Sequence, residues 1–257
     1  MKTTGRFLAT AVAILLATAG CGGGGGDGGG GMATNAAVGG IWRGTESASG
    51  LDVVGLVDEA GEFHFLRSDG VQYVGTVHSS GNSVSADFEG YTPFGSVFAD
   101  GTVHGTGTLS GTVNERSSMS GSTQFTTDLG GKTSGTITLT FDNLYNTDSS
   151  LAAISGVYTD SQSGDVISVS GNGDVFWQDP ATGCTANGTV SIINAAYNAY
   201  RVQFSYGNCV GAAAVLNGVQ FSGLGTLDAT ANPVQAIIGV TGKSGAGTYA
   251  FVFLVHR

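Results

Sequence analysis

Histidine and cysteine are the side chains here that could support the widest range of chemistry, and the chain contains four histidines, at positions 64, 78, 104 and 256. Zinc sites draw ligands from closely spaced patterns such as HxH or HExxH. None of the four histidines stands in such a pattern, although His64, His78 and His104 share the first half of the chain. Histidines scattered along strands more often face solvent than bind metal. We therefore expect neither a metal site nor a cofactor.

Sequence patterns typical of hydrolases and nucleotide-binding proteins are also missing. No serine stands in a GxSxG motif, which in hydrolases exposes the nucleophile on a strand-to-helix turn. The tripeptides at 131–133 and 242–244 resemble the end of a phosphate-binding loop, but Thr126 and Ile237 stand where that motif requires glycine. We expect a protein that is not an enzyme. Carboxylates cannot be paired from sequence alone, so the sequence does not indicate a glycosidase. An enzyme of unrecognised type is the alternative.

Cys184 and Cys209 are predicted to form a disulfide bond. A turn signal at 194–198 falls midway between them, which places both cysteines at the open end of one long hairpin. Bonding would close a loop of 25 residues and stabilise the fold by about 3 kcal/mol in the chain-entropy model. Because Cys209 is out of phase with the inward-facing Phe204, this prediction also requires a β-bulge near Gly207.

The amino terminus has the features of an export signal. Lys2 and Arg6 precede an apolar run at 7–17, which is too short to span a bilayer, and small residues at 17–20 lead to Cys21. Residues 1–20 resemble the signal peptide of bacterial lipoproteins. That resemblance implies that Cys21 is acylated, and Gly22 after it implies delivery to the outer membrane. An ordinary secretory signal is the alternative.

The residues after Cys21 predict a flexible tether. Almost every position from 22 to 31 is glycine, and such a tract buries too little surface to offset the entropy lost on ordering. We therefore assign residues 21–37 to the acylated cysteine and a glycine-rich linker.

Composition and charge exclude some partners. Removal of Lys2 and Arg6 with the signal leaves seven basic residues against 19 acidic ones. This negative charge would repel phosphate backbones, so we expect no nucleic-acid partner. It would also repel anionic lipid headgroups, so a membrane is expected as a partner only through the lipid anchor. With 45 glycines and only 11% charged residues, the rest of the chain suits short strands joined by tight turns.

Apolar and polar residues alternate with period two from about residue 39 onward, as at 83–88, 136–141 and 200–206. The two halves also resemble each other. Gly40-Ile41-Trp42 matches Gly156-Val157-Tyr158, and Gly107-Thr108-Leu109 matches Gly225-Thr226-Leu227. Each half holds about eight candidate strands, enough to close into a small antiparallel barrel. We predict an all-β fold with two tandem barrels, at 38–147 and 151–257. One larger sandwich or barrel shared by both halves is the alternative.

Aromatic residues fall mostly on the inward-facing positions of these strands. Such large side chains would fill a narrow barrel, and lining an apolar ligand is the functional alternative. The aromatic positions are Trp42, Phe63, Phe65, Tyr73, Phe88, Phe125, Phe141, Tyr158, Phe176, Trp177, Tyr200 and Phe204.

The glycine tether, the repeated Gly-x-aromatic openings and the Cys184–Cys209 hairpin together look like uncharacterised bacterial lipoproteins with calycin-like or transferrin-binding-protein-like β-barrels. The resemblance concerns architecture over most of the chain. The glycine-aromatic-glycine ending of transferrin-binding barrels is absent from residues 247–257. We expect a non-enzymatic binding or interaction module at the outer membrane, which contacts a protein or envelope component through loops at the barrel mouths. The alternative is a lipocalin-type carrier of a small apolar ligand.

Overall fold

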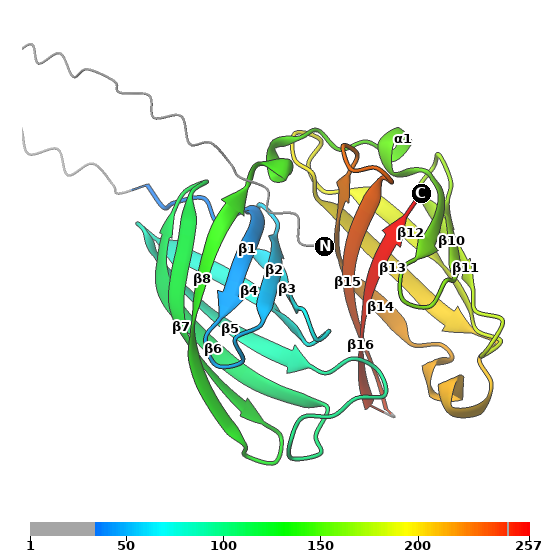
Figure 1. The fold of residues 1–257 in the computed structure, drawn as a ribbon, viewed down its shortest axis with the longest axis horizontal. Helices are drawn as coiled ribbons and strands as arrows, with labels where there is room; N and C mark the ends of the chain where they lie inside the picture. Colours follow the sequence, from blue (N-terminus) through cyan, green and yellow to red (C-terminus); the bar gives the residue numbers. More distant parts are fainter. Residues whose placement is uncertain (1–33, 246) are drawn as a thin grey trace, which may run out of the picture. The chain divides into compact units, whose positions relative to one another are not determined.

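The protein contains two closed antiparallel β-barrels of eight strands each (Figure 1), as the computed structural model shows. The structure describes residues 34–245 and 247–257, which form one compact unit from Thr34 to Arg257 apart from residue 246. Cys21, the predicted signal peptide and the glycine tract lie outside the described residues. The predicted pair of barrels is confirmed, and the shared larger barrel or sandwich is excluded.

The first barrel follows the chain in simple up-and-down order, with β8 pairing back to β1. Its strands are β1 (Gly40–Glu46), β2 (Asp52–Val57), β3 (Glu62–Arg67), β4 (Gln72–Ser80), β5 (Ser83–Tyr91), β6 (His104–Asn114), β7 (Ser118–Thr127) and β8 (Lys132–Asp142).

The second barrel has the same order and closes through pairing of β16 with β9. Its strands are β9 (Gly156–Asp160), β10 (Val166–Val169), β11 (Asp174–Gln178), β12 (Thr185–Ile192), β13 (Tyr200–Gly207), β14 (Gln220–Asp228), β15 (Gln235–Ser244) and β16 (Gly247–His256).

In the described part of the chain, three short helices connect or cover the strands: η1 (Asn143–Asn146) and α1 (Leu151–Ile154) between the barrels, and η2 (Gly211–Leu216) after β13. Among the residues that the structure describes, no helix has the length and apolar character needed to cross a membrane.

The alternating sequence pattern explains the strands. In β8, Ile137, Leu139 and Phe141 are buried while the threonines between them are exposed. A period of two places successive side chains on opposite faces, so the apolar set enters the barrel and the hydroxyls face solvent. The alternation at residues 136–141 of the sequence thus corresponds to one buried and one exposed face of this strand.

The chain entering β1 seals one end of the first barrel. Ala36 and Val38 are buried in the core, and the indole Nε1 of Trp42 donates a hydrogen bond to the Val38 carbonyl over 3.1 Å. The Ala36 amide donates to the carbonyl of Gly81, in the β4–β5 turn, over 2.9 Å. Residues 34–37, assigned from sequence to the tether, therefore contact the barrel: Ala36 is buried in its core, and Asn35 Oδ1 accepts a hydrogen bond from the Gly81 amide over 3.0 Å.

At the other end of the first barrel lie the connections β1–β2, β3–β4, β5–β6 and β7–β8. The corresponding end of the second barrel is covered by residues 208–219, which include η2. Ala213 and Leu216 of η2 are buried against the second core. This covering loop is held by the Cys184–Cys209 disulfide, so that predicted bond is confirmed.

The predicted bulge near Gly207 is wrong. Strands β12 and β13 pair without interruption from Thr185↔Gly207 to Ile192↔Tyr200. The chain is redirected after the strand instead, because Asn208 adopts a left-handed conformation with φ of 61°. Asn217 then holds the turned segment, accepting a hydrogen bond from the Cys209 amide and donating one to the Cys209 carbonyl.

Polar contacts connect the two barrels within the compact unit. Arg201 of β13 pairs with Glu62 at 2.7 Å and with Asp58 at 3.2 Å. The Gln72 side-chain amide donates to the carbonyl of Phe251 over 2.8 Å. The outer face of β3 and β4 is therefore partly buried, unlike the solvent-facing threonines of β8.

Candidate functional site

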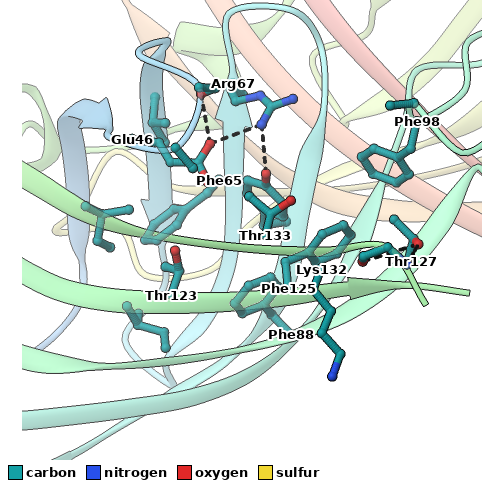
Figure 2. A pocket seen from close by; sticks show the side chains of 18 of the residues that line it. Glu46, Phe65, Arg67, Phe88, Phe98, Thr123, Phe125, Thr127, Lys132 and Thr133 are labelled. Atoms are coloured by element: carbon teal, nitrogen blue, oxygen red, sulfur yellow. Dashed lines mark hydrogen bonds and ion pairs between the residues drawn. The ribbon is translucent and has the colours of Figure 1, made fainter.

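A cavity of about 430 Å³ occupies the interior of the first barrel (Figure 2). It lies toward the end where the β1–β2, β5–β6 and β7–β8 connections contribute to its lining. The opposite end is the one sealed by the entering chain. The cavity is lined by Glu46, Ala48, Ser49, Val53, Phe63, Phe65, Arg67, Tyr73, Phe88, Phe98, Ala99, Asp100, Leu109, Thr123, Phe125, Thr127, Gly131, Lys132, Thr133 and Ile137.

Aromatic rings form much of the cavity wall. Tyr73 lies edge-on to Phe88, with ring centroids 5.3 Å apart, and Phe88 and Phe125 have parallel rings at 6.2 Å. Phe98, from the β5–β6 connection, approaches Phe125 at 5.3 Å. Phe88 and Phe125 are buried, as expected of core residues, and Tyr73 and Phe98 are partly buried; all four border an open space.

Glycines on neighbouring strands allow two of the rings to lie close to the barrel wall. Gly55 pairs with Phe65 in the β2–β3 register, and Gly107 pairs with Phe88 in the β5–β6 register. A Cβ added at either glycine would overlap the partnered ring. Each of these two rings therefore lies against the backbone of the adjacent strand.

One group of polar side chains borders this apolar cavity. Arg67 Nη1 donates to Glu46 Oε2 and to the Tyr73 hydroxyl, each over 3.0 Å. Arg67 also binds both carboxylate oxygens of Asp69, at 2.9 and 2.8 Å. Figure 2 shows Glu46 and Arg67 directed toward each other beside Phe65. Ser49 donates to the same Glu46 oxygen over 3.0 Å.

Electrostatics favour the charged forms of Arg67 and Asp69. Burial lowers the pKa of Arg67, but hydrogen bonds to Asp69 and Glu46 outweigh burial and raise it above its ordinary value. Burial also raises the pKa of Asp69, yet its bonds to Arg67 prevail and lower it overall. Burial and the charge of Glu46 raise the pKa of Tyr73 to about 12, so its hydroxyl stays protonated at neutral pH.

The remaining charged groups of the lining lie near the β7–β8 connection. Asp100 accepts hydrogen bonds from the hydroxyls of Thr102 and Thr127. Lys132 begins β8, and in Figure 2 its side chain extends away from the Glu46–Arg67 pair. The polar character of the cavity is therefore concentrated at Glu46, Arg67 and Tyr73.

Among the described residues of the second barrel, no ion pair corresponds to Glu46–Arg67. The offset that aligns Glu62 with Asp174 aligns Arg67 with Asp179, whose carboxylate binds its own loop at Ala181 and Thr182. Its aromatic rings pack against one another, with neighbouring centroids 5.2–6.1 Å apart. The packed rings are those of Trp177, Phe204, Tyr206, Phe221, Phe251 and Phe253.

Other residues singled out from sequence lie elsewhere. Trp42 packs edge-on against Phe141 toward the sealed end of the first barrel. Phe176 was expected inside the second barrel but is 46% exposed, because β11 directs Trp177 inward and Phe176 is out of phase with it. Within residues 34–245 and 247–257, no three histidine, cysteine or acidic side chains cluster as a metal site would require.

Sequence reasoning missed Glu46 and Arg67, although a signal was present. Glu46 shares the inward phase of Trp42, and Arg67 shares that of Phe63 and Phe65. A charge on an inward position of a barrel strand requires a buried partner. Two such charges on separate strands therefore could have indicated an internal ion pair.

No protein-family model matches this sequence, and a comparison with curated proteins gives no significant match.

Proposed function

We propose that the protein is a lipid-anchored, non-enzymatic binding protein whose first barrel holds one small, largely apolar molecule. The observation that carries this proposal is the cavity of about 430 Å³ with its wall of phenylalanines. Small-molecule sites range from about 300 to 1,000 Å³ and combine apolar walls with a few placed polar groups. Glu46, Arg67 and Tyr73 match that description.

The anchor is the part of the proposal that rests on sequence alone. Acylation of Cys21 would hold the barrels at an outer membrane through the glycine tract, as the lipoprotein-like signal implies. The bound molecule would then be a component of the envelope or a compound passing through it. The acidic charge of the chain suits a carrier held beside the membrane better than a barrel inserted among anionic lipids.

A second candidate is an interaction module that binds a protein through its loops. It is favoured by two exposed valines around η2: Val210 is 62% and Val215 is 45% exposed. Isolated apolar residues are normal on protein surfaces, however. A module that binds through its loops also has no need of an internal cavity lined by rings. We therefore favour ligand binding in the first barrel over this alternative.

Substitution of Thr123 by phenylalanine tests the proposal. Thr123 lies on β7 and faces the cavity, so a phenyl ring there would occupy the space that a ligand needs. The probe is N-phenyl-1-naphthylamine, an uncharged dye whose fluorescence rises in apolar surroundings. We expect the unsubstituted chain to bind it and Thr123→Phe to bind it at least about tenfold more weakly, a loss of roughly 1.4 kcal/mol.

The control is Ser122→Phe, which adds the same ring to the exposed face of β7. It should bind the dye as well as the unsubstituted chain. Both barrels have their own cores within residues 34–257, so the chain can be tested from residue 22 onward without acylation or detergent. Absence of dye binding, or equal binding by both phenylalanine variants, would contradict the proposal.

A further inference from the structure

We propose that the ligand of the first barrel is an apolar amine, whose ammonium group binds the carboxylate of Glu46 while its apolar part lies among the phenylalanines. This inference rests on the proposed function and adds a chemical class to it. It follows from the charges and hydrogen bonds around Glu46.

Glu46 is a buried carboxylate with unused capacity to accept hydrogen bonds. It is 6% exposed and lines the cavity. A carboxylate offers about four acceptor positions on its two oxygens. The hydrogen bonds from Ser49 and Arg67 both end on Oε2, which leaves Oε1 outside this pair of contacts. A donor group entering the cavity can therefore bind Glu46 without displacing Arg67.

Arg67, in contrast, has little capacity left for an anion. Its guanidinium has five N–H groups, and four of them donate to Asp69, Glu46 and Tyr73. A ligand carboxylate would lose the two-pronged pairing that makes arginine a strong anion site. It would also have to lie beside Glu46, whose charge would repel it.

The local charge balance favours a cation. Glu46 and Asp69 carry two negative charges against the single positive charge of Arg67. Lys132, the other cation of the lining, extends away from this pair (Figure 2). An ammonium group would therefore neutralise the excess negative charge, and a charge-assisted hydrogen bond is stronger than one from an uncharged hydroxyl.

Competition among three ligands with the same ten-carbon chain tests the proposal. Decylammonium, decan-1-ol and decanoate would each displace N-phenyl-1-naphthylamine at pH 7, below the concentrations at which they aggregate. We expect the ammonium to displace the dye best, the alcohol less well, and the carboxylate at least about tenfold less well than the ammonium.

Glu46→Gln should abolish most of the difference in affinity between decylammonium and decanoate. The uncharged amide neither attracts the ammonium nor repels the carboxylate. Asp128→Asn is the control, since it removes one negative charge from an exposed position after β7 and should keep the order. If decanoate binds the unsubstituted chain with the same affinity as decylammonium, the proposal is overturned, whether or not Glu46→Gln folds. An unchanged preference in folded Glu46→Gln would also overturn it.

The two proposals fail in different ways. Dye binding that Thr123→Phe abolishes, combined with no preference for the amine, would contradict only the inference about ligand class. Failure of the chain to bind the dye at all would contradict the proposed function itself.

Discussion

Single residues on strand β3 have opposite roles on its two faces. Phe65 and Arg67 face the cavity, whereas His64 is buried on the outer face, near Gln72 and Glu62. Burial lowers the pKa of His64 to about 4, although the charge of Glu62 acts in the opposite direction. The imidazole is therefore neutral in the folded protein at neutral pH. The low pKa of His64 therefore affects the stability of the protein in mild acid.

Replacement of His64 by glutamine should make the protein less sensitive to mild acid. Between pH 6.5 and about 4 the unfolded chain binds a proton at this histidine and the folded chain does not. The contribution of neutral His64 to the free energy of unfolding is therefore fully present above pH 6.5 and is lost as the pH falls toward 4. At pH 5 the free energy of unfolding should be lower by roughly 2 kcal/mol than at pH 7.5 because of this histidine. Urea unfolding at pH 7.5 and pH 5 measures it.

His78→Gln is the matched control, because His78 lies exposed on β4. It should lose as much stability between the two pH values as the unsubstituted chain does. An identical pH dependence for His64→Gln and the unsubstituted chain would show that His64 does not remain neutral when folded.

At the scale of residues, the sequence predicted the disulfide but not the ion pair of the cavity. Cys184 and Cys209 flank one hairpin, where strand pairing is local, so their pairing could be predicted. Glu46 and Arg67 come from different strands, and only closure of the barrel brings their side chains together. Alternation indicated that both face inward, but not what each would contact.

Among the elements, the strands were predictable and the ends of the barrels were not. Alternation with period two decides which face of a strand is buried, so eight strands per half could be counted from sequence. Whether a barrel end is open depends on how a connection folds over it. The β5–β6 connection brings Phe98 to the cavity, while residues 208–219 form η2 and cover the second barrel.

The covering loop of the second barrel should depend on its disulfide. Replacement of both Cys184 and Cys209 by alanine should lower the free energy of unfolding by about 3 kcal/mol in the chain-entropy model, because the unfolded chain gains freedom. Thermal unfolding would measure this as a lower midpoint. Reductant should lower the midpoint of the unsubstituted chain and leave that of the double variant unchanged. Equal midpoints without reductant would contradict a stabilising role.

At the scale of the whole molecule, two barrels with the same strand order have different interiors. Corresponding strands pair in the same order, yet the first barrel encloses a cavity with an ion pair and the second packs six rings together. Sequence similarity between the halves predicted the shared fold. It could not predict the difference, because that depends on how side chains from strands that are not neighbours meet in the centre of each barrel.

Contacts between the barrels were likewise beyond sequence reasoning. Arg201 and Gln72 lie on the outer faces of their strands, where alternation predicts solvent. Their partners come from the other barrel, about 140 or more positions away in the chain: Glu62 for Arg201 and the Phe251 carbonyl for Gln72. No local pattern encodes such pairing.

Native mass spectrometry of the protein purified from its host's membranes tests ligand binding most directly. A carrier barrel predicts the covalent mass of the chain plus one small molecule, which is lost on denaturation, and this excess should be missing from Thr123→Phe. Acyl groups on Cys21 would remain after denaturation and so would not be confused with the ligand. A native mass equal to the covalent mass, or the same excess in Thr123→Phe, would contradict binding in the first barrel.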